Sequence, residues 1–532
     1  MLKTIERKRA ELASLTRVAA SLINERLVTV DFCKQSIILS YSGTDETVCL
    51  QLIEPLHFRQ AVHASELHGE MKYNKRVVSS GADLMRIFGS WAKVDSESVG
   101  QICRELDNSV ENLERAYRGT RSLTFDSPAI DWEQSVIEGH GMHPWHKCRY
   151  PLVDDFEKAT IHFITLPQSD SITIEGDYDR RIRQIAPAEL NQVDKSRIIF
   201  PVHEYQLKNV RDAFPDAQVL AYTIIGRPQS SVRTVSLPDA NVDFCLKLPL
   251  AVKITSIVRT IRPWAITIGH RLEPVLNVVE EAAQSFGGSL KVIREPAAAA
   301  SPSEHLGCII RQSTESLAAQ TGEKVIVCAA VAEHIHEVWP EKTQTLEGKL
   351  DLLRAFSMHL FRAVLPPVLL HGFALQAHMQ NLLIRLDPES REVRGFFVRD
   401  LGSFRVYRET FSESTAPSST DLDSETASWV LTRSDSLEKV HRYILSVVHG
   451  DVASMVRALK LGMAGWRVAR EELERVIPAG DKFALARRTW LKSTECIARA
   501  HLSMQLFGVE SECTVTSIPN RFYYCQQEKD SD

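Results

Sequence analysis

Hydrophobic residues recur at helical spacing near the start of the chain. Between residues 5 and 27, apolar side chains return every three or four positions, which predicts an amphipathic helix. Three short runs rich in β-branched residues follow at 27–32, 36–41 and 48–53, with a polar turn at 42–45. This pattern predicts a helix followed by a three-stranded antiparallel meander.

The middle of the chain alternates short apolar runs with polar turns. Runs at 160–166, 171–175, 198–200 and 305–311 predict strands, whereas the alanine-rich stretch 296–304 predicts a low-complexity loop. A further run at 230–237 follows a Gly-Arg-Pro turn and alternates polar with apolar residues. It predicts a strand that presents Ser231, Arg233 and Thr234 to a ligand.

The last third of the chain predicts helices around one hairpin. Helical periodicity at 350–364 stops at a Pro-Pro pair and resumes from about 436 to 507, after a polar segment at 412–428 that predicts a mobile loop. Between them, apolar runs at 382–386 and 393–398 flank the turn Asp-Pro-Glu-Ser. Two paired strands would therefore bring Asn381 and Asp400 together beside His378.

Composition restricts the class of protein. At 532 residues the chain is long enough for about three domains, and its 44% hydrophobic and 25% charged residues are typical of soluble globular proteins. The formal net charge of −5 and pI of about 6.4 give no global basic field, so neither nucleic acid nor an anionic membrane is expected as a partner. Any anion site must be a local cluster of cations.

Cysteine usage and the absence of long apolar runs indicate a compartment. The ten cysteines are scattered, with no C-x-x-C pair and no Cys/His spacing typical of zinc, which predicts reduced thiols. The charged start of the chain does not resemble a secretory leader, and no run approaching 18 residues lacks both a charge and a Pro pair. We therefore expect a cytoplasmic protein.

Asn381 and Asp400 predict a metal site. An amide oxygen and a carboxylate at the two ends of a hairpin form a hard-oxygen pair suited to Mg²⁺ bound to nucleotide phosphates. The layout partly resembles protein kinases, in which an Asn and an Asp before a Gly hold the metal ions. No Gly-rich loop lies upstream and no His-Arg-Asp supplies a base. The alternative is that His378 and Asn381 merely cap or line an ordinary helix.

A second dense group of polar residues lies at 133–149. The stretch G-H-G-M-H-P-W-H-K-C-R places His140, His143, His146, Lys147 and Arg149 within ten residues. Lys and Arg form charge-assisted hydrogen bonds to carboxylates and phosphates, and His adds donors near neutral pH. We favour a loop that binds a polyanion over a metal site, because no acidic or Cys partner is spaced to complete one; a solvated loop is the third possibility.

After the stretches at 140–149 and 230–237, a third cationic stretch runs from residue 247 to 263, with the sequence K-L-P-L-A-V-K-I-T-S-I-V-R-T-I-R-P. Apolar residues alternate there with Lys247, Lys253, Arg259 and Arg262. The alternative to a binding function is a surface strand that leads into a helix with its basic face in water. Three cationic stretches and one Asn/Asp hairpin in a nearly neutral chain favour a cleft in which several anions meet, such as ATP and a di- or tricarboxylate.

These stretches also carry a family resemblance. G-H-G-M-H-P-W-H-K-C-R, S-V-R-T, K-L-P-L-x-x-K-I-T-S-x-x-R, and H-G-x-A-L-x-A-H-x-Q-N followed by R-D-L-G are similar to the signature blocks of the NRPS-independent siderophore (NIS) synthetases, the IucA/IucC family. The blocks occur in the family's order over nearly the whole chain and include L-I-N-E at 22–25 and P-V-H at 201–203.

The resemblance implies an α+β fold shaped as a cradled hand. Mixed and antiparallel sheets and a helical C-terminal region would form an N-terminal thumb over 1–125, anion- and ATP-binding fingers over 126–365, and a palm over 366–532 that is distantly related to kinases. Dimers are common in the family, so a homodimer is expected.

The resemblance also implies a reaction. Family enzymes adenylate a carboxylate of citrate or a related acid with ATP, release pyrophosphate, and transfer the acyl group from AMP to an amine or hydroxyl. The expected catalytic residues are Arg259, His378 and Lys247. By motif, the nucleotide and Mg²⁺ residues would be Ser231, Arg233, Thr234, Lys247, Arg259, His378, Gln380, Asn381 and Asp400, with Asn381 and Asp400 on the metal; those for the acid would be His143, Lys147, Arg149, Thr255 and Arg259.

The sequence departs from the family pattern at Gly141, Pro151 and Gln376. Gln376 stands where the family usually has an acidic residue two positions before the His, which bears on Mg²⁺ binding. Two rival functions follow. One is a kinase-like phosphotransferase acting on a small molecule, disfavoured by the missing Gly-rich loop. The other is a non-catalytic relative that binds nucleotide or acid.

Overall fold

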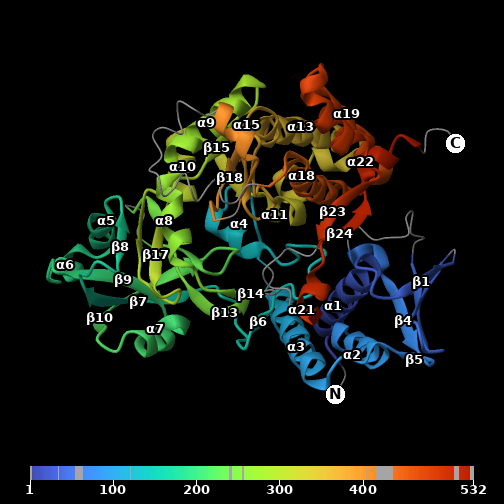
Figure 1. The fold of residues 1–532 in the computed structure, drawn as a ribbon, viewed down its shortest axis with the longest axis horizontal. Helices are drawn as coiled ribbons and strands as arrows, with labels where there is room; N and C mark the ends of the chain where they lie inside the picture. Colours follow the sequence, from blue (N-terminus) through green and yellow to red (C-terminus); the bar gives the residue numbers. More distant parts are fainter. Residues whose placement is uncertain are drawn as a thin grey trace.

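The fold is α+β, with several separate sheets flanked by helices (Figure 1). The computed structural model describes residues 3–33, 35–53, 64–119, 121–238, 242–254, 257–402, 404–414, 435–507 and 515–527. The predicted substrate residue Thr255 and residues 415–434, most of the predicted polar loop, lie outside these ranges. Residues 408–414, just before them, are helical.

The N-terminal region packs three helices beside a small sheet, and the predicted first helix and meander are confirmed. The five strands follow one another in the order β1-β2-β3-β4-β5, each antiparallel to the next. Its core also receives Trp145 and Leu502 from distant parts of the chain. The elements are α1 (Ile5–Asn24), β1 (Thr29–Phe32), β2 (Ser36–Ser40), β3 (Thr47–Leu52), β4 (Gly69–Tyr73), β5 (Arg76–Val77), α2 (Gly81–Ala92) and α3 (Ser96–Arg118).

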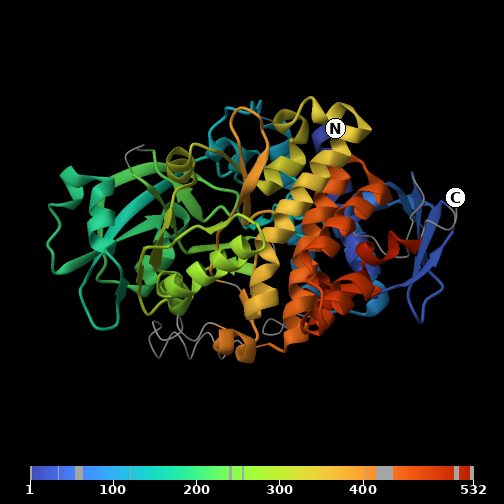
Figure 2. The same cartoon turned by 90° about the horizontal axis from the view of Figure 1, so that it is seen from above.

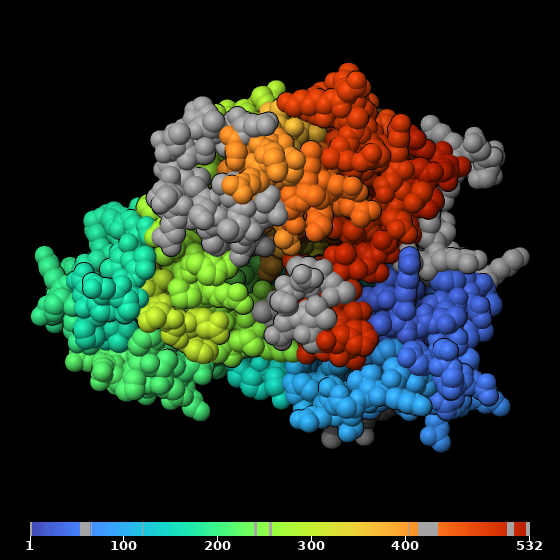
Figure 3. Space-filling view, viewed as in Figure 1, coloured from blue at the N-terminus to red at the C-terminus, as the bar shows by residue number. Residues whose placement is uncertain are grey.

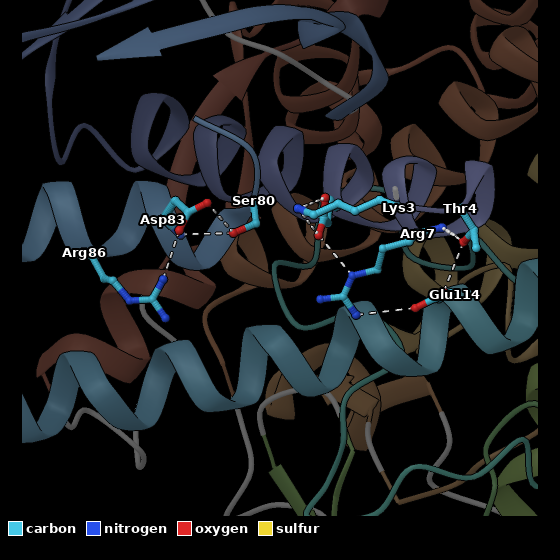
Figure 4. Close-up of polar contacts among 8 residues, drawn as sticks. Lys3, Thr4, Arg7, Ser80, Asp83, Arg86 and Glu114 are labelled. Atoms are coloured by element: carbon cyan, nitrogen blue, oxygen red, sulfur yellow. Dashed lines mark hydrogen bonds and ion pairs between the residues drawn. The ribbon is translucent and has the colours of Figure 1, made fainter. Parts of the chain in front are cut away.

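Polar contacts secure the ends of these helices (Figure 4). Thr4 caps α1 by accepting a hydrogen bond from the Arg7 backbone N–H at 3.2 Å, and Ser80 caps α2 in the same way toward Asp83. Arg7 also reaches Glu114 on α3, 3.4 Å away, which joins the two helices. A side-chain oxygen at this position satisfies a helix N–H that has no partner within the helix, and such caps contribute about 1 kcal/mol each.

An eight-stranded sheet dominates the middle of the chain, on the left of Figure 1. Its order is β8-β16-β17-β12-β11-β10-β7-β9, and every neighbouring pair is antiparallel. The strands are β7 (Ala159–Pro167), β8 (Thr173–Glu175), β9 (Arg197–His203), β10 (Gln218–Pro228), β11 (Thr234–Ser236), β12 (Phe244–Lys247), β16 (Ala297–Ala300) and β17 (Gly307–Gln312). Helices α5 (Tyr178–Ile185), α6 (Pro187–Leu190) and α7 (Leu207–Ala213) connect them.

Two sequence-based expectations about this sheet were wrong. The alanine run predicted to be a loop is strand β16, fully buried between β8 and β17, where small side chains suit close packing. The strand predicted over 230–237 begins only at Thr234, so Ser231 and Arg233 lie in the turn before it.

The basic stretch after residue 247 forms two strands of a separate three-stranded sheet, in the order β14-β13-β6. Pro249 follows β12, and a proline cannot donate to a strand ladder, so the chain leaves the large sheet there. The strands are β6 (Arg149–Tyr150), β13 (Leu250–Ile254) and β14 (Ile257–Arg259), and the helices that follow are α8 (Pro263–Arg271) and α9 (Glu273–Ser285).

The C-terminal region combines a four-stranded sheet with long helices. The sheet order is β15-β21-β20-β18, and the predicted hairpin is confirmed as β20 (Leu382–Leu386) and β21 (Val393–Val398). Asp387 starts its turn by accepting hydrogen bonds from the backbone N–H groups of Glu389 and Ser390. The other elements here are β15 (Leu290–Val292), α10 (Thr314–Thr321), β18 (Lys324–Val327), α11 (Cys328–Glu333), α12 (Ile335–Val338), β19 (Phe373–Leu375), β22 (Phe404–Val406) and α15 (Arg408–Ser414).

Long helices cover this sheet, as Figure 2 shows for α13 (Leu346–Val364) beside α18 (Leu437–Leu459). They share one hydrophobic core with the hairpin, and that core draws on both sides of residue 365, the predicted boundary. The division into three domains stays a prediction. Along with α13 and α18, the helices are α14 (Pro366–His371), α19 (Gly462–Val476), α20 (Ala484–Ala486) and α22 (Arg521–Tyr524).

One helical stretch, Leu346–His371, is apolar and long enough by composition to cross a membrane. The share of its most apolar window that is buried inside the protein is 72%, because α13 packs against α18 and α19. A helix that is mostly buried in this way packs as part of the protein core.

The end of the chain departs from the predicted helical pattern. Strand β23 (Glu495–Arg499) interrupts the region predicted to be helical up to 507 and pairs with β24 (Val515–Pro519). Helix α21 (His501–Phe507) follows β23 and lies beside α1, at the other end of the sequence (Figure 1). The blue, green and red surfaces thus meet near the centre of the molecule (Figure 3).

Candidate functional site

The hairpin places its two predicted metal residues side by side. Leu382 pairs with Val398, and the backbone N–H of Arg399 donates to the Asn381 carbonyl at 3.0 Å. Asn381 and Asp400 therefore leave the sheet at the same edge, as the sequence predicted.

Asp400 turns back toward the large sheet. Its backbone has φ 73°, in the left-handed region that non-glycine residues seldom adopt, and its Oδ1 accepts a hydrogen bond from Lys247 Nζ at 2.8 Å. Burial by itself would raise the pKa of Asp400, but Lys247, Arg311 and Arg233 outweigh it and hold that pKa well below its usual range. The carboxylate is thus charged and available to a cation.

A second carboxylate lies behind Lys247. Glu295 Oε1 is 2.7 Å from an Arg311 nitrogen and 3.9 Å from Lys247 Nζ, and all three side chains are buried. Arg311 therefore neutralises Glu295, and Lys247 remains oriented toward Asp400.

The turn before β11 carries strained backbone and unpartnered hydroxyls. Val232 has φ 68° and is buried, and a β-branched residue in this region is a genuine outlier of the kind that concentrates at functional sites. The buried hydroxyl oxygens of Ser231 and Thr234 have no hydrogen-bond partner among the described residues. Buried polar atoms are normally paired, so these two fit a polar ligand. Arg233 lies between them and donates to the Thr260 carbonyl at 3.3 Å.

Arg259, at the end of β14, faces several other cations. Burial, together with the charges of Arg233, Arg149 and Arg499, lowers its pKa to about 10 despite the opposing effect of Asp400. An anion bound here would relieve this repulsion.

His378 lies beside Asn381. Asn381 Nδ2 donates to the Gln376 carbonyl at 3.1 Å and is 3.5 Å from His378 Nε2. Burial and the charge of His140 lower the pKa of His378 to about 4, so the imidazole is neutral at pH 7. Gln380 joins the network through its backbone, since its carbonyl accepts a hydrogen bond from Arg399 at 2.7 Å.

The His140–Arg149 loop borders the same site. His143 is buried, and His501, His140, His146 and Arg259 add to the effect of burial in holding its pKa well below the usual range. Arg149 is also buried, and its pKa falls to about 10 mainly because of that burial. Both residues therefore lie in a desolvated, cationic environment that suits a carboxylate.

Lys147 points elsewhere. Its Nζ donates to the Val136 carbonyl at 2.6 Å, and the residue lines a cavity together with Glu133, Arg149 and Ser230. Burial and the charge of Arg149 lower its pKa to about 8. The structure thus brings His143 and Arg149 toward Arg259, while Lys147 contacts the back of the loop.

An ion pair that the sequence analysis missed joins the loop region to the hairpin. Arg399 donates to both carboxylate oxygens of Glu133, at 2.5 and 3.1 Å, and each side chain is buried. Arg399 also donates to Gln229 Oε1 at 3.0 Å and to Ser230 Oγ at 3.3 Å. The pair therefore fixes the turn before β11 against the hairpin. Its members are 266 positions apart, and no local pattern signals such a pairing.

The sequence analysis also missed two residues near the end of the chain. The charge of Arg499 acts on Arg259, His378, His140 and His501, so its guanidinium lies among them. His501 packs against His143, with ring centroids 4.0 Å apart. The only signal in the sequence was their chemistry, because Arg499 and His501 lie in a stretch whose periodicity had been interpreted as helical.

The residues present fit a Mg·nucleotide. Within the described ranges no three His, Cys, Asp or Glu side chains are grouped to hold a metal ion by themselves. Mg²⁺ does not require such a group, because it keeps several waters and binds one or two carboxylates plus phosphates. Asp400 and Asn381 supply hard oxygens, and the unpartnered hydroxyls and clustered cations suit phosphates.

Comparison with known proteins identifies related sequences. Residues 128–333 match the model of the IucA / IucC family, and residues 351–510 match that of the ferric iron reductase FhuF-like transporter. The NRPS-independent siderophore synthetase rfs of Rhizopus delemar is 26% identical over 84% of this chain and 74% of its own length. The NRPS-independent siderophore synthetase-like protein ankE of Aspergillus thermomutatus is 28% identical over 71% and 67%. An L-2,3-diaminopropanoate–citrate ligase of Staphylococcus aureus is 26% identical over 60% and 61%.

Solved structures share the fold. ATP-bound aerobactin synthetase IucA from Klebsiella pneumoniae superposes with a TM-score of 0.77 at 14% identity, covering 96% of this chain and 99% of that one. The family model, the relatives over most of the chain and the shared fold agree with the resemblance of the signature blocks. The chain therefore contains an IucA/IucC family domain over residues 128–333 and is a homologue of the NRPS-independent siderophore synthetases.

Proposed function

We propose that this protein is an ATP-dependent ligase that adenylates citrate or a related di- or tricarboxylic acid and joins it to an amine or hydroxyl. AMP and pyrophosphate would be released, and the product would be a siderophore or a related metabolite. The names of its relatives support a ligase of this class, since they include siderophore synthetases and a citrate ligase.

The observation that carries the proposal is the convergence of cations on Asp400. Lys247 is in direct contact with this carboxylate, and the charges of Arg233 and Arg259 act on the same place from the turn and from β14. Attack of a carboxylate on a phosphate is slow because like charges repel and negative charge develops on the phosphate. Fixed cations in a desolvated site stabilise that charge without having to reorganise.

The residues take separate roles. Ser231, Arg233, Thr234 and Lys247 would hold the phosphates through charge-assisted and hydroxyl hydrogen bonds. Arg259 would bridge the α-phosphate and the attacking carboxylate. His378 is neutral, because burial lowers its pKa to about 4, so it would donate one hydrogen bond at the reacting centre without adding charge.

The acid would lie between the His140–Arg149 loop and β14. Among the residues predicted to bind the acid, His143 and Arg149 interact electrostatically with Arg259. They are therefore the expected carboxylate partners. Lys147 remains a candidate, although its ammonium donates to Val136. Thr255 lies outside the described residues and is proposed by motif alone.

Mg²⁺ would bind to Asp400 and Asn381 and would neutralise charge on the nucleotide phosphates. We further propose the cradled-hand arrangement with a kinase-like palm, domain boundaries at 125 and 365, a cytoplasmic location and a homodimer. No nucleic acid or membrane partner is proposed.

Nucleotide product analysis tests the proposal. Purified protein would be incubated with Mg·ATP, hydroxylamine as a substitute nucleophile, and citrate, 2-oxoglutarate, succinate or malate in turn. AMP and pyrophosphate formed with one acid are expected, together with the corresponding hydroxamate. ADP instead of AMP would favour the kinase-like alternative. No turnover with any acid, but binding of ATP, would favour a binding protein in which Gln376 replaces the usual carboxylate.

A further inference from the structure

His501 lies at the junction of the two ends of the chain. It is the first residue of α21, and the next residue, Leu502, is buried in the core of the N-terminal region. Figure 1 shows α21 beside α1, away from the other C-terminal helices. The segment thus brings C-terminal residues to the His140–Arg149 loop, where His501 contacts His143.

Glu25 fixes the start of this helix. Its carboxylate accepts hydrogen bonds from the backbone N–H groups of Leu502 and Ser503, at 3.0 and 2.6 Å, and from Ser503 Oγ at 2.7 Å. The first N–H groups of a helix have no partner within the helix, so a carboxylate that binds two of them holds that turn in place. Thr516 Oγ1 also donates to the Asn24 carbonyl at 2.5 Å, which adds a second tie to the end of α1.

The imidazole of His501 faces the other histidines of the site. Its ring centroid is 4.0 Å from that of His143 and 5.6 Å from that of His140. Its Nε2 atom is buried and has no hydrogen-bond partner among the described residues. Burial and the charges of His140 and Arg499 hold its pKa well below the usual range, so the ring is neutral and able to accept a proton.

We propose that His501 accepts the proton of the attacking amine in the second half of the reaction, and that Glu25 is its positioning residue. The inference rests on the proposed function and adds a role that the signature blocks do not assign. The amine nitrogen forms a bond to the acyl carbon, the bond from that carbon to the AMP oxygen breaks, and AMP leaves with the electron pair. The proton lost from the nitrogen goes to His501 Nε2.

The cations around His501 should allow it to act as a base only when the acid is bound. Arg499 penalises a protonated imidazole at His501, and Arg259 acts in the same way on His143, the ring that His501 contacts. A bound di- or tricarboxylate would offset those cations, raise the proton affinity of His501, and make it an effective base only when the acyl group is in place.

The test separates the two half-reactions. Acid-dependent exchange of labelled pyrophosphate into ATP reports adenylation, and a single-turnover assay with ethylenediamine or hydroxylamine reports transfer. We expect His501→Gln to slow transfer to ethylenediamine by about 100-fold or more, since a general base typically contributes 10²–10⁴-fold. Transfer to the less basic hydroxylamine should slow far less. The wild-type loss of transfer rate toward low pH, measured after correction for the fraction of unprotonated amine, should disappear.

Glu25→Gln keeps an oxygen acceptor but loses the charge, and should slow ethylenediamine transfer more weakly than His501→Gln does, with the pH profile displaced rather than abolished because the imidazole is still present. Matched controls are His68→Gln and Glu438→Gln, both at exposed positions outside the site. These two variants should transfer at the wild-type rate.

Three results overturn the inference while the proposed function stands. They are wild-type ethylenediamine transfer by folded His501→Gln, an unchanged pH profile in that variant, or an equal loss of exchange and transfer, which would assign His501 to acid binding. If His501→Gln does not fold, Glu25→Gln decides instead: a wild-type transfer rate together with an unchanged pH profile overturns the inference. Absence of exchange in the wild type would instead refute the proposed function itself.

Discussion

Replacing Arg259 by Gln should separate catalysis from stability. The wild-type guanidinium is held among Arg233, Arg149 and Arg499, and burial together with these charges lowers its pKa to about 10. Gln removes the charge and keeps a polar side chain of moderate length. The proposed role of Arg259 is to bridge two anions, so its loss should act mainly on the adenylation step.

Arg259→Gln should slow adenylation but should not lower the free energy of unfolding. Loss of one preorganised contact to developing charge raises a barrier by about 2.7–4 kcal/mol, so adenylation should slow by about 100–1000-fold. The pKa of this cation is lower in the folded protein than its ordinary value of 12.5, so at neutral pH the charge opposes folding. The difference corresponds to at most about 3 kcal/mol, and Arg259→Gln should therefore keep or slightly raise the free energy of unfolding.

Pyrophosphate–ATP exchange measures the first effect and urea unfolding the second. Arg262→Gln is the matched control, because Arg262 belongs to the same basic stretch but is exposed, and it should leave both quantities unchanged. The reasoning is refuted if Arg259→Gln exchanges within about threefold of the wild-type rate, which is under 1 kcal/mol. It is also refuted if the variant loses several kcal/mol of stability.

Three other predictions concern stability and the metal. Arg399→Ala leaves Glu133 buried without its partner and should cost about 3–5 kcal/mol in urea unfolding, most of which Glu133→Gln in the same chain should restore; no recovery would contradict the pairing. Burial lowers the pKa values of His378 and His441 to about 4, so the unfolded chain binds more protons than the folded one between pH 6.5 and 4. The free energy of unfolding should fall over that window by about 1.4 kcal/mol per pH unit for each such His, and a constant thermal midpoint from pH 7 to 5 would argue against it. Gln376→Glu adds a carboxylate beside Asn381 and should lower the Mg²⁺ concentration for half-maximal AMP formation by about tenfold, whereas an unchanged requirement would place Gln376 outside the metal's surroundings.

The hairpin strands could be predicted from the sequence because the pattern that marks them is local. Leu382–Leu386 and Val393–Val398 were predicted with their observed bounds, because β-branched and aromatic runs flank a turn begun by an Asp side chain. Ala297–Ala300 was missed because alanine is depleted in strands, and only burial between two neighbouring strands makes it suitable there.

The candidate site could be predicted only in part. Lys247, Arg259, His378 and Asp400 could be proposed from the sequence because each belongs to a compact motif. The contacts that bring them together join residues far apart in the sequence, such as Lys247 to Asp400 across 153 positions. Arg499, His501 and the Glu133–Arg399 pair belong to no such motif, so only the folded structure shows them.

Oxygen transfer from the acid to the nucleotide tests the central claim most directly. Citrate, or whichever acid supports turnover, would be labelled with ¹⁸O in its carboxylates and incubated with the protein, Mg·ATP and an amine. In an acyl-adenylate mechanism the attacking carboxylate oxygen stays on the α-phosphate, so the account predicts label in AMP. Label in inorganic phosphate together with formation of ADP would contradict it, because the carboxylate would then have attacked the γ-phosphate.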